Sequence, residues 1–300
     1  MTSPETRPEM SPRADLLTQQ DGIANVLQVI WCHASLCAWF CFGLVILPVE
    51  FFVPMSVFVS LVHQRAMSEW LHEGSHFNLI PNRPRNDAVT NALTGCWFGI
   101  SVATYRRAHF PHHARREFFV TGDPDTNFLA VTSRRQLWSA VIRDLVGWTA
   151  LQGFLRFDSN AVSGASRLPF LVLTAILHVA LLIWLYSVGG LLAYAVYYGT
   201  LLTLYPLHNR LRVYGQHVTL VKDGASIFAH SETSRTIDAG RFDRLFWTSP
   251  RLLYHWEHHS HPHIPYRALA ERCNRADDEN RYSQRRWSLL RDLYRGIAGD

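Results

Sequence analysis

The sequence predicts an all-α integral membrane protein with four transmembrane helices in two hairpins and a cytoplasmic helical cap that carries histidine clusters. Long apolar runs occur in two pairs, and polar blocks lie between and after them. Histidine is unusually frequent, with 16 in 300 residues. Charged residues make up only 18% of the chain, below the usual quarter, while hydrophobic residues make up 48%. This composition excludes a disordered chain.

The first hairpin is predicted over residues 23–70. Residues 23–47 are nearly all apolar, which at ~1.5 Å rise per residue is enough to cross a bilayer. Pro48 and Pro54 then interrupt the pattern, and a second, shorter apolar run begins at Phe51. The prolines therefore mark a tight turn between two spans.

The second hairpin is predicted over residues 168–207. Two clear apolar runs, residues 168–187 and 191–207, are separated by Val188, Gly189 and Gly190. Each run approaches the ~20 residues that a helix needs to cross the hydrocarbon core.

The hairpins divide one domain, residues 22–300, into alternating membrane and polar blocks. The polar blocks are residues 71–167 and 208–300. Residues 1–21 are polar and contain three prolines, so we expect them to form a disordered N-terminal tail. Within the first polar block, a weaker apolar stretch over residues 88–104 predicts a re-entrant or interfacial helix.

Charge predicts the orientation of the chain in the membrane. The two hairpin turns contain no Arg or Lys, whereas eleven arginines lie in the polar block between the hairpins. By the positive-inside rule this block and both termini are cytoplasmic. All polar blocks then share one face of the membrane, as in a multi-pass protein. The arginine bias and the compact length further favour a bacterial protein, so we expect it in the bacterial inner membrane.

Three histidine clusters stand out in the polar blocks. They are HEGSH with His72 and His76, HFPHH with His109, His112 and His113, and HWEHH with His255, His258 and His259. Helical residues three or four apart lie on one face, so each cluster would direct its imidazoles the same way. Imidazole is a common ligand for iron, zinc, copper and nickel. Eight ligands exceed one tetrahedral zinc site and suit two metal ions with open positions.

Chance accounts for one of these clusters but not for all three. At this histidine content an HxxxH pattern is expected about once per chain, and HxxHH about 0.05 times. Two copies of HxxHH are expected in about one such chain in a thousand. The alternative for a single cluster is a polar helix face with solvated or capping histidines.

The order of these motifs resembles the membrane fatty acid desaturase superfamily, which also includes hydroxylases and carotenoid ketolases. The resemblance rests on HEGSH, YRRAHFPHH, GDPDTNF, NRLRVYGQH and YHWEHHSHPHIPY, and it covers about residues 72–266. It implies that the clusters bind two non-haem irons and that His217, which follows the last span, is a ninth ligand. His208 and His230 lie close to His217 in the sequence and are alternatives for that place.

The resemblance also implies an activity. We expect an O2-dependent di-iron oxidoreductase that desaturates a fatty acyl chain, with no catalytic residue beyond the metal ligands and no other cofactor. The acyl chain could be free or linked to CoA or a carrier protein. Electrons are expected from a separate ferredoxin or cytochrome b5-type protein, because the chain has no such module. Hydroxylation or ketolation of a lipid or carotenoid by the same fold is the alternative.

Three carboxylates are candidates to orient the ligands. Asp123 and Asp125, in GDPDTNF, and Glu257, inside HWEHH, are expected to accept the second N–H of ligating imidazoles. The alternative for the two aspartates is a proline turn.

Membrane lipids are further expected partners, since the formal charge of +5 suits anionic head groups. Nucleic acid is not expected, because no recognised motif accompanies the charge.

A non-enzymatic membrane protein is the alternative from a different class. A metal transporter would place its ligands near the bilayer midplane, and a haem protein would need paired histidines inside the spans, for which only His33 and His178 qualify. We expect these two, and His63, to bond to neighbouring helices instead. A membrane-bound zinc hydrolase is disfavoured by the number of ligands.

Overall fold

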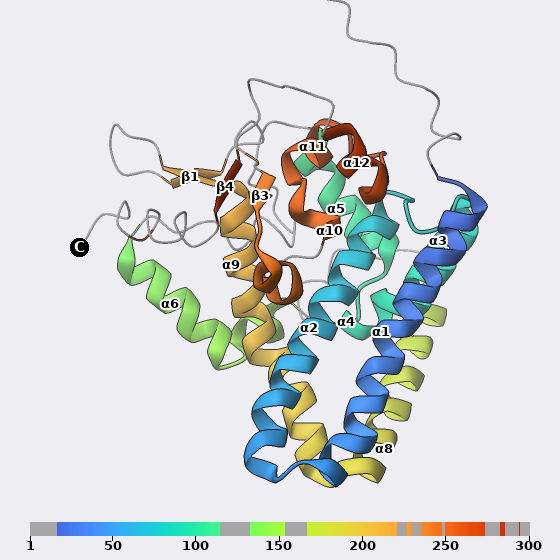
Figure 1. Ribbon diagram of the computed structural model, residues 1–300, viewed down its shortest axis with the longest axis vertical. Coiled ribbons are helices and arrows are strands. Elements are labelled where there is room, and N and C mark those ends of the chain that lie inside the picture. Colours follow the sequence, from blue (N-terminus) through green and yellow to red (C-terminus); the bar gives the residue numbers. More distant parts are fainter. Residues whose placement is uncertain are drawn as a thin grey trace, which may run out of the picture.

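The computed structural model describes the chain over residues 17–114, 133–153, 167–220, 227–229, 236–247, 250–273 and 283–285, and at Ser234 and Tyr294. Over these ranges the protein is almost wholly helical, in line with the all-α prediction (Figure 1). Strands within the described ranges are short. They are β1 (Val218–Leu220) antiparallel to β2 (Ile227–Ala229), and β3 (Thr236–Asp238) parallel to β4 (Ser283–Arg285).

Two long antiparallel helices form the predicted first hairpin. Helix α1 (Gln19–Ile46) includes the last three residues of the segment 1–21 that was expected to be a disordered tail. The reason is a capping box, in which Thr18 accepts from the backbone N–H of Asp21 and the Asp21 carboxylate accepts from Thr18. Helix α2 (Val49–Ser75) begins directly after Pro48. Pro54 lies inside the helix, so the turn between α1 and α2 is marked by Pro48 and not by Pro54.

Helix α8 (Arg167–Gly199) forms the predicted second hairpin. At Gly190 the backbone leaves helical geometry, with φ 60° and ψ −150°, which glycine adopts without steric cost. The chain then continues as a π-helical segment, η3 (Thr200–Leu204), into α9 (Tyr205–His217). The break at Gly190 confirms the expected turn.

The two hairpins share an apolar core. Phe40 of α1 and Phe52 of α2 pack edge to face with ring centroids 6.0 Å apart, in one cluster with Leu185 and Tyr197 of α8. The outer faces of α1 and α8 carry many exposed large apolar side chains. Among the described residues, the helices long and apolar enough to cross a membrane are Gln19–Ile46 and Leu168–His217, the second of which contains the break at Gly190.

The polar block after α2 is a series of short helices. They are α3 (Arg83–Thr90), the π-helical η2 (Asn91–Gly95), α4 (Cys96–Phe98), α5 (Val102–Ala114) and α6 (Arg134–Leu145). The helix predicted over residues 88–104 forms as far as Phe98, because α3, η2 and α4 follow one another without a break, but it ends at Gly99 and not at Thr104. Gly99, in the left-handed region at φ 66°, ends α4, and the Asn91 side chain accepts from the backbone N–H of Val102 at the start of α5.

The C-terminal block adds four short helical segments. They are η5 (Asp243–Trp247), α10 (Pro250–Leu253), α11 (His255–Ser260) and α12 (Tyr266–Cys273). Figure 1 shows the α1–α2 turn at one end of the molecule and α5, α11 and α12 at the other, beside the last turns of α2. The three helices that carry the histidine motifs thus meet at one end.

Candidate metal centre

The first motif lies at the C-terminal end of α2. His72 is inside α2, and His76 is the residue that caps it, so HEGSH forms the C-terminal end of this helix. Both side chains are buried, and their ring centroids are 5.0 Å apart. The helix ends because Phe77 takes a positive φ of 60°. The HEGSH motif, called box one below, is therefore held by a long helix.

Gly74, in the middle of this motif, lets α2 approach its neighbours closely. A Cβ atom at this position would collide with the Thr90 side chain at the end of α3. The Gly74 carbonyl accepts from Nδ2 of Asn86 at 2.8 Å, and Asn86 in turn accepts from the backbone N–H groups of Leu79 and Ile80. The glycine thus fixes the end of α2 against α3.

The second motif lies on α5. His109 and His113 are one helical turn apart, and their Nε2 atoms are 2.8 Å from each other. Their ring centroids lie 4.8 Å from those of box one, for the pairs His72–His109 and His76–His113. His112 belongs to the same helix, but its side chain lies outside what the structure describes. Its role as a ligand stays a prediction.

The third motif lies on α11, beside the last residue of α9. His217 ends α9, and its Nε2 lies 2.7 Å from Nε2 of His255. Nε2 of His259 lies 3.1 Å from the same atom. His258, on another side of the short helix, packs against box one, with its ring centroid 4.6 Å from that of His72.

The eight candidate ligands whose side chains the structure describes form two groups. In each group one nitrogen per ring lies within 4.8 Å of the others. The larger group is His72, His76, His109, His113 and His258, and the smaller is His217, His255 and His259. The HWEHH motif is thus divided between the two groups. The rings of His113, in the larger group, and His259, in the smaller one, stack with their centroids 4.4 Å apart and so connect the groups.

The donor set of the smaller group fits a metal ion. One ring nitrogen either donates or accepts one hydrogen bond. Nε2 of His255 therefore cannot form a good hydrogen bond with both Nε2 of His217 and Nε2 of His259. Three nitrogens that converge from two helices are instead typical of imidazole ligands around a common ion. The five-membered group offers the same chemistry with more donors, so each group could hold a metal ion.

Burial keeps the His255 imidazole in the form that binds metal. His255 is 1% exposed, and this burial, reinforced by the neighbouring His217, holds the pKa of His255 well below its ordinary value. A ring with a lowered pKa is neutral at pH 7 and has a free lone pair on one nitrogen for a cation.

The predicted orienting carboxylates are only partly described. Glu257 is buried on α11, and its Oε2 accepts from Oγ1 of Thr236 at 2.5 Å. Asp123 and Asp125 lie outside the described residues. Glu73 is also buried, with Oε1 3.7 Å from Nδ1 of His72. A role of Glu257 toward the ligating rings stays a prediction.

Arg106 connects the helices that carry the first two motifs, a role that we did not predict from the sequence. From α5 its Nε donates to the Ser75 carbonyl at 2.6 Å, and its Nη atoms bond both oxygens of Asp87 at 2.9 and 2.6 Å. The guanidinium also lies over the ring of Phe77, 3.7 Å from the centroid. Arg106 is three residues before His109, so this contact sets α5 against the end of α2. A basic residue one turn before a histidine motif was the available signal.

The remaining histidines have other partners. His208 bonds the Phe246 carbonyl at 2.9 Å and belongs to neither group, and His230 lies outside the described residues. His33 contacts the Leu93 carbonyl and His63, so both of its ring nitrogens are occupied. This confirms bonding between helices for His33 and His63 and disfavours haem ligation.

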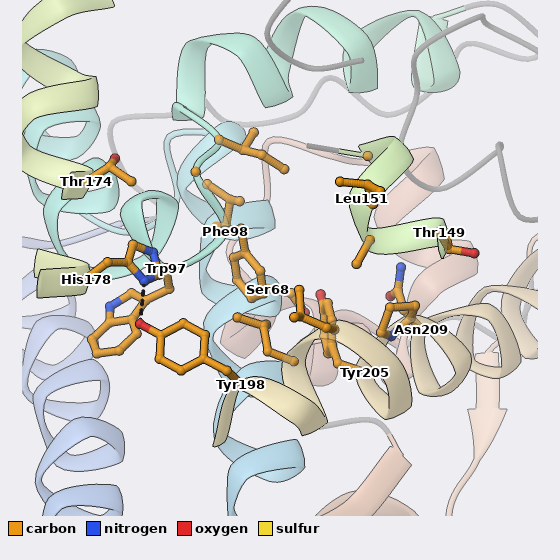
Figure 2. A pocket seen from close by; sticks show the side chains of 18 of the residues that line it. Ser68, Trp97, Phe98, Thr149, Leu151, Thr174, His178, Tyr198, Tyr205 and Asn209 are labelled. Carbon is orange, nitrogen blue, oxygen red and sulfur yellow. Dashed lines mark hydrogen bonds between the residues drawn. The ribbon is translucent and has the colours of Figure 1, made fainter. Parts of the chain in front are cut away.

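A cavity of about 1110 Å³ reaches the larger group. His72 lines it together with mostly apolar side chains of α4, α8 and α9. Figure 2 shows His178 and Tyr198 on one side, Phe98 and Ser68 near the middle, and Thr149, Leu151 and Asn209 on the other side. Its volume is at the upper end of the range for small-molecule sites, about 1,000 Å³. No signal in the sequence marks the cavity, because its lining comes from separate segments.

Comparison with known proteins agrees with the geometry. The family model for fatty acid desaturase matches residues 48–288. No curated protein matches the chain. The match spans α2, all three histidine motifs and both halves of α8. This protein therefore belongs to the fatty acid desaturase family.

Proposed function

We propose that the protein is a membrane-bound, O2-dependent oxidoreductase that introduces a double bond into a fatty acyl chain, with two iron ions held by its histidines. The observation that carries the proposal is the contact between the larger imidazole group and the cavity. His72 belongs to both, so a long apolar substrate in the cavity lies against the metal ligands.

Each of the two groups of histidines would hold one iron ion. His72, His76, His109, His113 and His258 would hold one iron, and His217, His255 and His259 the other, with His112 as a predicted further ligand. When bound, the ions would supply the O2 activation needed to remove hydrogen from an unactivated C–H bond. His113 and His259 stack between the groups, so the two ions would lie close together.

The cavity residues would bind the chain and exclude water. Leu71, Phe98 and Ile100 give the wall beside His72 an apolar surface, which expels water from the reacting carbon atoms. Tyr105 lines the cavity and packs its ring 5.2 Å from that of His109. These contacts would decide which carbon atoms face the ligands, since a misplacement of about 1 Å is enough to change the outcome.

The two helical hairpins would anchor this centre in the bilayer. We infer four spans, from α1, the first part of α2 and the two halves of α8. The exposed apolar residues on α1 and α8 support this inference, because large exposed apolar surfaces are rare in soluble monomers. The arginines between the hairpins favour a cytoplasmic centre, and we propose the bacterial inner membrane.

Electrons would come from a separate protein. Each double bond formed with one O2 releases two waters and requires two electrons and two protons beyond the two hydrogens of the substrate. We propose that a ferredoxin or cytochrome b5-type protein supplies these two electrons. The acyl chain would be free or linked to CoA or a carrier protein.

Lipid analysis after expression in a bacterial host tests the proposal. Deuterium-labelled fatty acids should acquire a new double bond with the wild-type protein and with His261→Ala, a residue outside both groups, but not with His72→Ala. A hydroxylated or ketonic product that carries ¹⁸O from ¹⁸O2 would move the assignment to hydroxylase or ketolase chemistry. Turnover by His72→Ala at the wild-type rate would contradict the proposal.

A further inference from the structure

His178 and Tyr198 form a polar pair inside the apolar second hairpin. His178 is in the first half of α8, Tyr198 is in the second half, and Nδ1 of His178 lies 2.8 Å from the Tyr198 hydroxyl (Figure 2). Both side chains line the cavity, together with Trp97 and Thr174. A polar pair is costly in such a segment unless its hydrogen bonds are satisfied, so its hydrogen-bond directions are informative.

The second ring nitrogen of His178 fixes those directions. Nε2 lies 2.9 Å from the carbonyl oxygen of Cys96, and a carbonyl oxygen only accepts. Nε2 therefore carries the hydrogen. In the neutral ring Nδ1 is then an acceptor, so the Tyr198 hydroxyl donates to it. The phenol hydrogen is used in this bond, and the phenol oxygen keeps its capacity to accept.

This end of the cavity lacks charge. From Leu168 to Gly199, α8 contains no Asp, Glu, Lys or Arg, and among the described lining residues the charged side chain is Arg212, which belongs to α9. Arg212 bonds Asn209 and Gln216 at 2.9 and 2.8 Å. A carboxylate placed beside Tyr198 would meet an acceptor oxygen and no cation. The pair therefore suits a neutral group that donates a hydrogen bond.

The cavity also reaches the outer face of α8. Leu171, Val179 and Leu182 line it, and they are 43%, 54% and 40% exposed on a segment that is apolar enough to cross a membrane. A ligand dissolved in the bilayer would therefore meet the cavity wall directly. This favours a lipid over a water-soluble ligand at this end.

We propose that Tyr198, oriented by His178, accepts a hydrogen bond from a hydroxyl group on the hydrocarbon part of a bilayer-dissolved lipid, and so selects hydroxylated over plain or keto chains. This inference rests on the proposed function, because it takes the cavity as the substrate site. Tyr198 contacts the substrate in this account, and His178 is a positioning residue.

A matched pair of probes tests the direction of the hydrogen bond. Methyl 15-hydroxyhexadecanoate and methyl 15-oxohexadecanoate differ only in that the alcohol donates and the ketone cannot. Each would compete with tritiated methyl hexadecanoate for the full-length protein in phosphatidylcholine nanodiscs, measured by scintillation proximity. We expect the alcohol to compete about five- to tenfold better with the wild type, the effect of one net hydrogen bond.

Three variants test whether the preference for the alcohol depends on His178 and Tyr198. Tyr198→Phe removes the acceptor and should make the two probes equal. His178→Leu frees the phenol hydrogen for the ketone and should also abolish the preference. Tyr186→Phe, on the exposed face of the same helix, should keep it. The wild-type comparison needs no variant, so a variant that fails to fold does not prevent the test.

The outcomes are distinct from those of the activity assay. Equal competition by the two probes in the wild type, a preference retained in Tyr198→Phe, or no competition by either probe would overturn the assignment. Double-bond formation without any hydroxyl preference would overturn this inference alone. A preference with no iron-dependent turnover would overturn the proposed function and leave the hydroxyl site in place.

Discussion

Nε2 of His217 lies 2.7 Å from Nε2 of His255, although the residues are 38 positions apart and belong to different helices. This contact joins the end of α9, which continues the second hairpin, to α11 in the C-terminal block. It makes His217 a member of the smaller imidazole group, a place that the sequence left open between His217, His208 and His230.

Replacement of His217 tests whether the two groups hold separate ions. His217→Ala leaves the smaller group with two imidazoles, too few to retain iron, while the larger group keeps all five. We expect the iron content to fall from two to one per chain, measured by plasma emission spectroscopy on anaerobically purified protein. His208→Ala, on the same helix but outside both groups, is the control and should keep two irons. Two irons in His217→Ala would remove this residue from the ligand set.

His258 provides the complementary test on the larger group. It is fully buried and contacts the rings of His72, His76 and His113, so its loss opens the centre of that group. His258→Ala should lower turnover at least about 100-fold, because a direct ligand matters at least as much as the residues that orient ligands. His261→Ala, three residues along the chain, should retain full turnover. Equal turnover in the two variants would contradict the assigned roles.

His112 is the ligand that only the sequence supports. If it binds iron as HFPHH predicts, His112→Ala should lose iron and turnover as severely as His113→Ala does. Parallel metal analysis of the two variants measures this directly. Wild-type iron content in His112→Ala would limit the ligand set to the eight histidines of the two groups.

Arg106 should stabilise the larger group without touching an ion. Arg106→Met removes hydrogen bonds to the Ser75 carbonyl and to Asp87, and we expect a loss of about 1.5–3 kcal/mol in unfolding free energy. Iron affinity should weaken as well, because α5 is no longer fixed to the end of α2. Arg107→Met, at the adjacent exposed position, is the matched control in thermal unfolding and iron titration. An Arg106→Met protein with the stability and iron affinity of this control would contradict the role.

Replacement of Gly74 by alanine tests the packing that positions the HEGSH motif. In Gly74→Ala the new methyl group collides with Thr90, and overpacking of this kind typically costs about 1–3 kcal/mol. The melting temperature should fall, and iron occupancy of the larger group with it. Gly240→Ala has no heavy atom within 4 Å of the new Cβ and should be neutral. An unchanged melting temperature in Gly74→Ala would show that α3 yields without effect on the motif.

The sequence predicted the parts of this protein that have a short-range signal. The apolar runs predicted both hairpins, and Gly190 lies at the expected turn. The spacing within HEGSH predicted that His72 and His76 gather, because residues three and four apart share a helix face. The same expectation is wrong for HWEHH, where His258 joins the larger group and His255 and His259 join the smaller one. The capping box at Thr18 was readable in principle, although the polar composition around it favoured a tail.

Other features depend on contacts between distant segments. The division of HWEHH between two groups follows from how α11 lies between α2 and α9, which no local pattern encodes. The end of the predicted helix 88–104 at Phe98, before α5 begins, depends on Gly99 and on the Asn91 side chain. The cavity and the contact of Arg106 with α2 join residues that are unremarkable in the sequence.

Metal analysis of the wild-type protein decides whether the two imidazole groups hold iron. We expect two iron ions per chain in protein purified under anaerobic conditions, with zinc at background level. Stoichiometric zinc without iron, or a chain that binds no metal while folded, would contradict the assignment of the two imidazole groups as an iron centre.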